Sequence, residues 1–377
     1  MKHTLIERAK VVGKTKFGSQ INLRPNKSIL PAALTPANAF ANKADNQLIL
    51  TDKFGRNFPY LRLSITDICN FSCDYCLPNG YLAPNHNGMA KPKFLSLNEI
   101  DNLVTAFAQL GTHKIRLTGG EPTLRRDFTD IVKTISSHQA ITKLAFTTNG
   151  YKLKQNIHKW RAAGINAINV SIDSLNAERF YKLTGHDRLN DILAGIDTAF
   201  DAGFEQVKVN AVLLKDVNDI ELDLFLAWVK NTPINVRFIE LMQTGDNQNY
   251  FDKFHVSAAD LRDKLLNQGW QIKPTSADAG PAQLLVHADY VGSIGIIAPY
   301  SKDFCTNCNR LRITSKGDLR LCLFGEQGLS IRHLLQHADQ LDELKQLILG
   351  QLAFKKSSHF LAMGDTGATA NLSTIGG

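Results

Sequence analysis

The feature that most restricts the fold of this chain is a regular alternation of strand-like and helix-like segments, which runs from about residue 58 to residue 242. Such alternation implies parallel strands joined by right-handed helical crossovers, and therefore an α/β fold. Gly111, Gly164 and Gly203 stand where the C-terminal caps of helices are expected. The predicted strands are 60–66, 113–118, 143–148, 166–172, 206–214 and 235–241, and the predicted helices are 97–110, 127–137, 152–163, 189–202 and 220–230.

The predicted strands alternate between apolar and polar residues, which is unusual for parallel strands covered by helices on both faces. One face of the sheet therefore carries charge across several strands, with Arg62, Lys114, Arg116, Lys208 and Arg237 on it. A closed barrel filled with side chains would not tolerate these charges, because buried charges need partners. An exposed face of an antiparallel sheet is the alternative, and the intervening helices argue against it. We therefore predict a wide, incomplete barrel whose interior binds large anionic ligands.

Three cysteines follow the first predicted strand in a C-x3-C-x2-C pattern: Cys69, Cys73 and Cys76. Thiolates this close together are ligands for soft metals, and iron–sulfur clusters are one of their common uses. The alternatives are a structural zinc site, or a disulfide with one spare thiol, although zinc sites more often use paired C-x2-C units. Three thiolates would leave one iron of a four-iron cluster open to a ligand that is not protein.

Other conspicuous segments lie where the next strands end, and functional groups of such barrels belong at the carboxyl ends of the strands. Gly119-Gly120-Glu121-Pro122 follows the second predicted strand, 147–150 ends the third, and 171–173 ends the fourth. Paired glycines allow a ligand to lie against bare backbone. We therefore expect a binding site at this end of the barrel, beside the cysteine loop.

A second cysteine triad, Cys305, Cys308 and Cys322, lies in the C-terminal third of the chain with the spacing C-x2-C-x13-C. Zinc bound by three cysteines and a distant His or water is an open alternative to a cluster. The two triads use all six cysteines of the chain, which favours a second cluster. Around this triad the alternation of strand-like and helix-like segments is weaker. A short helix at 258–268 and strand-like residues at 283–298 predict an α+β extension.

Composition restricts the compartment and the partners. No run of 18 apolar residues and no signal-like apolar segment occurs, and six cysteines fit a reducing compartment, so we expect a cytoplasmic protein without membrane contact. Residues 1–50 carry +6 of the net charge of +8, so the charge gives little reason to expect nucleic-acid binding by the folded part. We predict that this tail is largely disordered. It is poor in acids, as transit peptides are, but Ser and Arg are scarce, so its role stays open.

Taken together, these elements resemble the GTP 3′,8-cyclase family, the radical S-adenosylmethionine (SAM) enzymes that begin molybdenum-cofactor synthesis. The resemblance covers about residues 52–377. It implies an incomplete (βα)6 TIM-type barrel over 51–242, a cluster- and substrate-binding region over 243–377, and a tail over 1–50 outside the family pattern. It is carried by 54–56 (weakly), 61–76, 114–122, 147–150, 169–171, 207–210, 237–242, the second triad with Arg310 and Arg312, and the terminal Gly376-Gly377.

The resemblance also implies two [4Fe–4S] clusters, one on each triad. The first would chelate SAM and yield a 5′-deoxyadenosyl radical that takes the 3′ hydrogen of GTP, after which C3′ attacks C8 of guanine. The second would hold the guanine. The implied SAM residues are Tyr75, Gly120, Ser171 and Met242, the implied GTP residues are Arg62, Arg116, Thr147, Lys208, Arg310, Leu311 and Arg312, with Lys114 and Arg237 as second choices, and the implied catalytic residues are Arg62, Gly376 and Gly377.

The family further implies an electron-donor protein, a homodimer, and handover of the product to the next enzyme of the molybdopterin pathway. Two alternatives remain from the residues themselves. One is another radical SAM enzyme with an auxiliary cluster, such as a peptide-maturing one, against which Arg310-Leu311-Arg312 and the Gly-Gly terminus speak. The other is a zinc-stabilised module whose basic tail binds nucleic acid.

Overall fold

The computed structural model describes residues 49–81, 93–276, 279–370, 372 and 375. Within them, twelve strands form one sheet in the order β12-β11-β10-β1-β2-β3-β4-β5-β6-β9-β8-β7. Strands β1 to β6 are parallel and adjacent in chain order, as the alternation of segments predicted. The strands are β1 (Tyr60–Ser64), β2 (Lys114–Thr118), β3 (Lys143–Thr148), β4 (Ala167–Ser171), β5 (Val207–Leu213), β6 (Ile234–Glu240), β7 (Gln271–Lys273), β8 (Gln283–Val286), β9 (Ser293–Ile297), β10 (Arg310–Ile313), β11 (Asp318–Arg320) and β12 (Leu329–Ser330).

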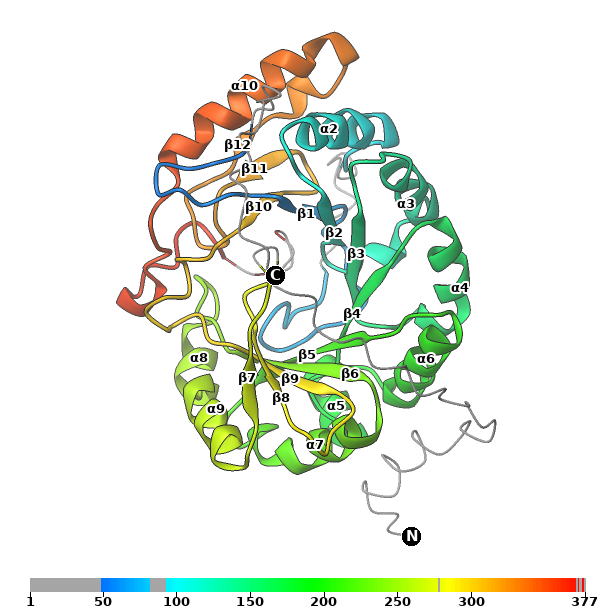
Figure 1. Cartoon of the computed structure of the whole chain (residues 1–377), viewed down its shortest axis with the longest axis vertical. Helices are drawn as coiled ribbons and strands as arrows, with labels where there is room; N and C mark the ends of the chain where they lie inside the picture. The colour runs from blue at the N-terminus through cyan, green and yellow to red at the C-terminus, as the bar shows by residue number, and fades with distance from the viewer. Residues whose placement is uncertain (1–48, 82–92, 277–278, 371, 373–374, 376–377) are drawn as a thin grey trace, which may run out of the picture.

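The sheet curves around a central space and the helices lie outside it (Figure 1). Strand β10 extends the parallel part beyond β1, and β9 extends it beyond β6. The two ends of the sheet, β12 and β7, do not pair with each other in the described residues, so the barrel is incomplete, as predicted. The helices are α2 (Leu97–Gln109), α3 (Phe128–Ser136), α4 (Leu153–Ala163), α5 (Ala177–Thr184), α6 (Leu189–Asp201), α7 (Leu222–Asn231), α8 (Gln248–Phe254), α9 (Ala258–Asn267) and α10 (Leu341–Gln351).

Strand β1 ends at Ser64, two residues earlier than predicted. The hydroxyl of Thr66 accepts a 3.1 Å hydrogen bond from the backbone N–H of Ile68, which bends the chain into the cysteine loop. The structure also contains helix α5, which the strand–helix alternation did not predict. Its ends carry ordinary signals, because the Asn176 side chain caps its N-terminus and Gly185 ends it in a left-handed conformation.

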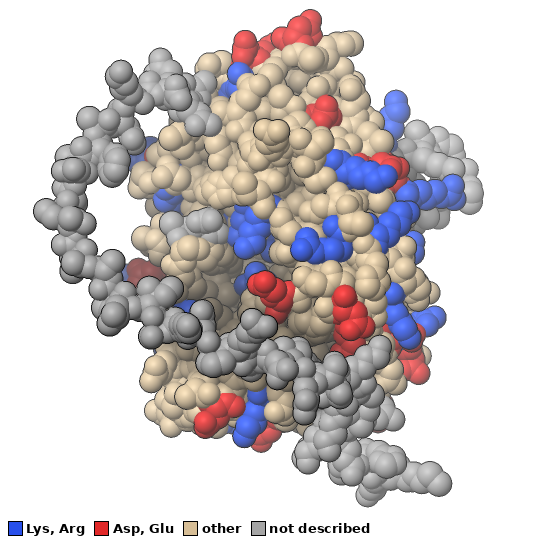
Figure 2. Space-filling model, turned by 45° about the vertical axis from the view of Figure 1, so that its right-hand side comes forward, with Lys and Arg blue, Asp and Glu red and all other residues tan. Residues whose placement is uncertain are grey.

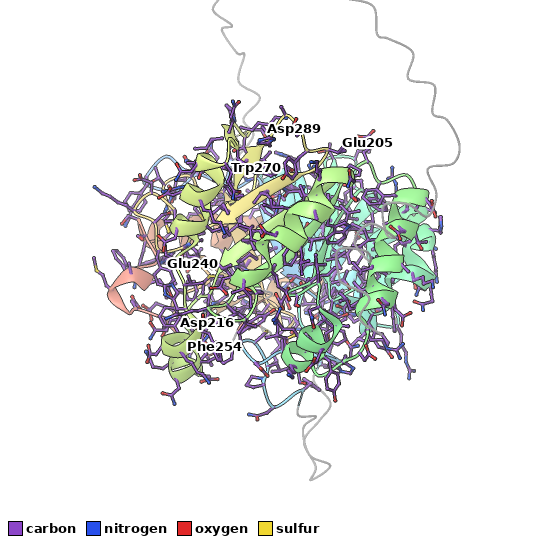
Figure 3. The ribbon with its side chains drawn as sticks, turned by 90° about the horizontal axis from the view of Figure 1, so that it is seen from below. Glu205, Asp216, Glu240, Phe254, Trp270 and Asp289 are labelled. Carbon is purple, nitrogen blue, oxygen red and sulfur yellow. The ribbon has the colours of Figure 1, made fainter. Side chains whose placement is uncertain are left out.

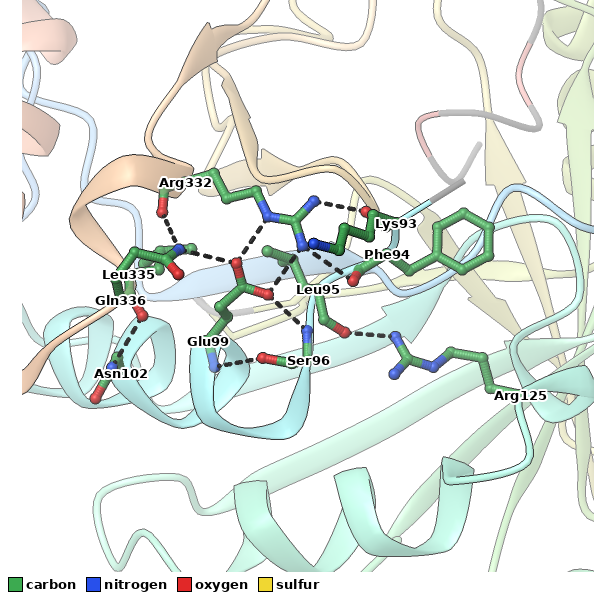
Figure 4. A network of polar contacts seen from close by, with 10 residues as sticks. All are labelled: Lys93, Phe94, Leu95, Ser96, Glu99, Asn102, Arg125, Arg332, Leu335 and Gln336. Carbon is green, nitrogen blue, oxygen red and sulfur yellow. Dashed lines mark hydrogen bonds and ion pairs between the residues drawn. The ribbon is translucent and has the colours of Figure 1, made fainter. Parts of the chain in front are cut away.

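The C-terminal region is joined to the barrel through helix α2 (Figure 4). Ser96 and Glu99 form a capping box at the start of this helix. The carboxylate of Glu99 also accepts hydrogen bonds of 2.7 and 3.0 Å from the guanidinium of Arg332, which lies 233 residues further along the chain. One side chain therefore caps a barrel helix and binds the C-terminal region to it.

The opposite edge of the sheet is closed by β7, β8 and β9, with helices α7 to α9 outside (Figure 3). Trp270, directly before β7, is buried and its ring lies 4.7 Å from that of Tyr290. On β6, which pairs with β9, the Oε1 of Glu240 lies 2.9 Å from the Nε2 of His255. Within the described ranges, none of the helices combines the length and the apolarity that a membrane span requires.

Candidate active site

A cavity of about 370 Å³ occupies the interior of the barrel, and we call it the basic chamber. The polar residues of the alternating strands point into it, as the sequence pattern predicted. In the described part of its wall there is no Asp or Glu. Such a cavity suits a ligand with several negative charges. Its basic wall residues are Arg62, Lys114, Arg116, Lys143, Lys208, Arg237, Arg310 and Arg312.

Strand register places these cations in layers, as inward side chains are layered in barrels of this kind. Tyr60 of β1 is the register partner of Lys114 on β2 and of Arg310 on β10. Two residues further along the strands, Arg62 is the partner of both Arg116 and Arg312. The structure therefore brings together the predicted GTP residues Arg62, Arg116, Thr147, Lys208, Arg310 and Arg312 along the chamber wall.

Leu311 differs from the other predicted GTP residues. It lies between Arg310 and Arg312 on β10, it is fully buried, and it belongs to the hydrophobic core. Because side chains alternate along a strand, it faces away from the chamber. Only its backbone could meet a ligand there.

Burial and mutual repulsion perturb the charged groups of the chamber. Burial lowers the pKa of Lys208 to about 7, with Arg237 and Arg116 adding repulsion. Burial likewise lowers the pKa of Arg62 to about 10, and that of Arg237 to about 10. These shifts arise from burial and from the neighbouring cations, so a bound polyanion would stabilise the charged forms of these side chains.

The second cysteine triad lies at the amino ends of the strands. Cys308 precedes β10, Cys322 follows β11, and all three thiols line the basic chamber. Burial raises the pKa of the Cys305 thiol. Burial alone would also raise that of Cys308, but Lys355 and Arg310 lower it. The thiolate form that metal binding needs is therefore favoured at Cys308.

The first cysteine triad lies beyond the carboxyl end of β1, so the two triads occupy opposite ends of the barrel. The two ends of β1, beyond which the triads lie, are about 13 Å apart, at about 3.3 Å per residue. The chamber reaches from the second triad to Met242, which follows β6 near the first triad's end. The sequence did not predict this arrangement, because it placed functional groups only at carboxyl ends.

The cysteine loop of the first triad is held by the barrel. Ser72 and Asp74 donate backbone hydrogen bonds to the carbonyls of Thr184 and Leu183 at the end of α5. Burial raises the pKa of the Cys69 thiol to about 11 and that of Cys76 to about 12. Thiols buried in this way bind metal only on losing their protons, so cluster assembly here releases protons.

The thiols of each triad lie near enough to repel one another as thiolates. Yet in the part of the chain that the structure describes, no three His, Cys, Asp or Glu side chains converge on a single metal ion. A four-iron cluster needs each thiolate at a different iron, whereas a tetrahedral zinc site needs all its ligands around one ion.

The paired glycines after β2 are required by the protein's own backbone. A Cβ on Gly120 would lie 2.3 Å from the carbonyl oxygen of Ile68, and one on Gly119 would lie 2.2 Å from that of Thr66. The N–H of Gly120 donates a 2.9 Å hydrogen bond to the Thr66 carbonyl. The glycines therefore allow β2's loop to pack directly against the cysteine loop.

The other predicted SAM residues lie at the same end of the barrel. The phenol of Tyr75 donates a 2.8 Å hydrogen bond to Asp173, which follows β4. Ser171 ends β4 and is partly buried, and Met242 lines the chamber. The predicted catalytic residues Gly376 and Gly377 lie outside the described residues. Ile375, directly before them, is buried, and its carbonyl accepts a 3.2 Å hydrogen bond from Arg312.

The sequence interpretation missed several residues of the chamber wall. Tyr60, Lys143, Asn210 and Asn235 line it although none was proposed as a site residue. The sequence could have indicated them, because each lies an even number of positions from a predicted inward residue of its own strand and therefore points to the same face.

Comparison with known families gives two matches on this chain. Residues 63–229 match the model of the Radical SAM superfamily, and residues 234–361 match the model named Molybdenum Cofactor Synthesis C. These matches meet within the single sheet, at β6.

Comparison with curated proteins gives relatives that align over nearly their whole length. The GTP 3′,8-cyclase of Yersinia pestis is 56% identical over 328 residues, which are 87% of this chain and 99% of the relative. That of Vibrio vulnificus is 52% identical over 326 residues, or 86% of this chain and 97% of the relative.

Solved structures support the fold. Streptococcus suis SuiB has a TM-score of 0.53 at 16% identity, covering 84% of this chain and 74% of SuiB. A second SuiB structure, bound to S-adenosylmethionine, has a TM-score of 0.52 at 14% identity and covers 76% of this chain and 68% of that one.

Proposed function

The chain belongs to the GTP 3′,8-cyclase family of radical SAM enzymes, and from this premise we propose that its basic chamber binds GTP between two iron–sulfur clusters. The activity is conversion of GTP to (8S)-3′,8-cyclo-7,8-dihydroguanosine 5′-triphosphate, the first step of molybdenum-cofactor synthesis. The observation that carries the proposal is the chamber itself, whose described wall presents eight Lys or Arg side chains and no carboxylate. A nucleoside triphosphate supplies the missing negative charge.

Different side chains of the chamber would bind different parts of GTP. Lys208, Arg116 and Arg237 would bind the triphosphate, because guanidinium and ammonium groups form the strong, charge-assisted hydrogen bonds to phosphate. Arg310, Arg312 and the Leu311 backbone would place the base beside the second triad. Arg62, two residues from Tyr60 on β1, would hold the ribose region, and Thr147, 3.4 Å from Arg116, would fix that guanidinium.

The first triad would bind the [4Fe–4S] cluster that the radical SAM family implies, with SAM beside Tyr75, Gly120, Ser171 and Met242. When bound there, SAM supplies a 5′-deoxyadenosyl radical. The protein's contribution is to fix the substrate and to exclude water. The terminal Gly376 and Gly377 would enter the site from Ile375, which Arg312 holds at the chamber.

A second [4Fe–4S] cluster on Cys305, Cys308 and Cys322 is the finer part of the proposal. Its support is the position of all three thiols on the chamber wall and the positive charge of Lys355 beside them. Metal analysis of protein purified without oxygen tests it: about eight iron per chain supports two clusters, and zinc in place of half of the iron would contradict the second.

An electron donor is also part of the proposal, and a groove of about 350 Å³ between the start of α3 and α4 suits its docking. Arg126, Lys152 and Lys159 line this groove, and its described wall has no Asp or Glu. Tyr151 of the groove packs edge-to-face, 6.4 Å between centroids, on Phe71 of the cysteine loop. Figure 2 turns the α3 and α4 side of the barrel forward, and on this face Lys and Arg side chains stand together with Asp and Glu side chains.

An acidic electron-transfer protein fits this surface. Replacing Arg126→Glu together with Lys159→Glu should slow reduction of the enzyme by such a donor and leave reduction by dithionite unchanged. Equal rates with the protein donor in both enzymes would contradict the docking site. A homodimer, product handover to the next pathway enzyme and a cytoplasmic location stay predictions from the sequence.

The test of the main proposal is anaerobic incubation of reconstituted protein with SAM, a reductant and GTP. We expect 5′-deoxyadenosine and the cyclised nucleotide in equal amounts. Formation of 5′-deoxyadenosine with no product derived from GTP would contradict it and would favour another radical SAM reaction.

A further inference from the structure

We infer that Tyr60 is a further residue of the GTP site: its phenol positions Arg116 and acts as the counter-charge of the basic chamber, a role that passes to the triphosphate when GTP binds. The inference rests on the proposed function, because it takes GTP as the ligand of the chamber.

Tyr60 lies on β1 between β10 and β2, and all three strands carry Lys or Arg side chains that line the chamber. It is the first residue of β1, only 3% of it is exposed, and it lines the chamber. The Nε of Arg116 donates a 2.6 Å hydrogen bond to its phenol oxygen. The Nζ of Lys114 lies 4.4 Å from the centre of its ring. The phenol thus fixes one cation through its oxygen and contacts a second through its ring.

The phenol is also one of few groups in the chamber that can carry negative charge. In the described wall, the other such groups are the thiols of the second triad, which metal binding would commit to iron. Among the described residues of the wall, the charged side chains that face Tyr60 are cations: Arg62 on its own strand, Lys114 and Arg116 on β2, and Arg310 on β10, with Lys143, Lys208, Arg237 and Arg312 further around the wall.

The electrostatics agree with this geometry. Burial alone would raise the pKa of Tyr60, but Arg116, Arg62 and Lys114 lower it to about 7. Across the chamber, burial lowers the pKa of Lys208 to about 7. Near neutral pH the ligand-free chamber therefore reduces its own positive charge in two ways, by losing a proton from Tyr60 and by losing one from Lys208.

A bound triphosphate reverses both changes. Its negative charges raise the pKa of the phenol and of the ammonium, so each group takes a proton from solvent. GTP binding is then coupled to proton uptake. Uptake increases as the pH rises through about 7, because more of both groups is deprotonated before binding, and the apparent Kd for GTP rises with pH in proportion to the protons taken up.

The test compares wild-type holoenzyme with Tyr60→Phe, which keeps the ring against Lys114 and removes only the hydroxyl. GTP is titrated calorimetrically without SAM or reductant, in two buffers of different ionisation enthalpy, between pH ~6 and pH ~8. By linkage, the variant should take up about half a proton less per GTP at pH ~7 and about one proton less at pH ~8. The slope of log Kd against pH should fall by the same amount.

At pH ~6, where the phenol is neutral, the variant should bind GTP up to about tenfold more weakly, because the Nε of Arg116 has lost its hydrogen-bond partner. Tyr181→Phe is the matched control, since Tyr181 is 53% exposed on α5, and it should leave proton uptake unchanged.

Equal proton uptake by the wild type and Tyr60→Phe would overturn the inference. If that variant fails to assemble its clusters, the wild type alone decides, because uptake that does not increase between pH ~6 and pH ~8 contradicts titrating groups with pKa values near 7. A wild type that does not bind GTP at all would instead overturn the proposed function.

Discussion

The Nη1 of Arg56 donates a 3.0 Å hydrogen bond to the carbonyl of Cys305, a residue 249 positions further along the chain. The same guanidinium donates to the carbonyls of Lys356 and Ser357 and is paired with Asp52 at 2.7 Å. Arg56 therefore joins the segment before β1 to two separate segments around the second triad. Its position in the sequence, in a weakly matching Phe-Gly-Arg element, gave no sign of this role.

Replacing Arg56→Gln should release the loop that carries Cys305. Glutamine cannot form the several hydrogen bonds of the guanidinium, and it leaves buried Asp52 without its cation, at a cost of roughly 3 kcal/mol. We expect iron to fall from about eight to about four per chain, with the first cluster kept. Arg262→Gln, whose side chain is 36% exposed, is the control. Full iron content in Arg56→Gln would refute this role.

Replacing Gly120→Ala should remove the first cluster and leave the second. The new Cβ would meet the carbonyl of Ile68 at 2.3 Å, a backbone contact that only a shift of the cysteine loop relieves. We expect iron to fall by about half and SAM cleavage to disappear. In Gly350→Ala, on helix α10, the added methyl meets nothing within 4 Å, so this control should keep both clusters and gain slightly in stability. A fully loaded, active Gly120→Ala would show that the loop can move aside.

Replacing Cys305→Ala should separate the two halves of the reaction. The first triad lies at the other end of the barrel, so we expect SAM cleavage to 5′-deoxyadenosine to continue while the cyclised nucleotide is not formed. Nucleotide analysis by liquid chromatography measures both products. Cys69→Ala, which alters the first triad, should lose both. Normal cyclisation by Cys305→Ala would mean that the second triad has no part in holding the substrate.

The sequence predicted the barrel well because its strands carry two signals at once. Their alternation with helices gave the parallel order, and the polar positions Arg62, Lys114 and Lys208 gave the inward face, since side-chain direction alternates strictly along a strand. These two signals do not predict the register, that is, which residues of neighbouring strands lie side by side. The pairing of β10 with β1 aligns Arg310 with Tyr60. The same pairing brings the second triad to the amino ends of the strands.

The residues that the sequence could not identify act through contacts between distant segments. Arg56 and Arg332 are single basic residues whose partners lie more than 200 positions away. Tyr60 reads as an ordinary strand aromatic until Arg116 and Lys114 are placed beside it. Local pattern carries no information on such pairs, because they depend on how the complete sheet closes.

The Glu99–Arg332 pair makes the stability of the C-terminal junction dependent on pH (Figure 4). Burial alone would raise the pKa of Glu99, but the hydrogen bonds from Arg332, Ser96 and Gln336 lower it to about 2, from 4.5. A carboxylate whose pKa is lower in the folded state stabilises that state when the pH is above the pKa of the unfolded state. This stabilisation is lost as the pH falls toward the pKa of the folded state. Glu99→Gln should therefore cost roughly 2 kcal/mol at pH ~7, allowing for solvent screening.

This difference between wild type and Glu99→Gln should narrow as the pH falls below about 4.5 and become small near pH ~2, where half of the wild-type carboxylate is itself protonated in the folded state. Urea unfolding of the two proteins across this range, followed by circular dichroism, measures it. Glu178→Gln is the control, because Glu178 is paired with Lys182 in solvent on α5, and it should be indistinguishable from the wild type. A cost for Glu99→Gln that stays constant down to pH ~2 would mean that the side chain acts through its shape and its capping bonds, and not through its charge.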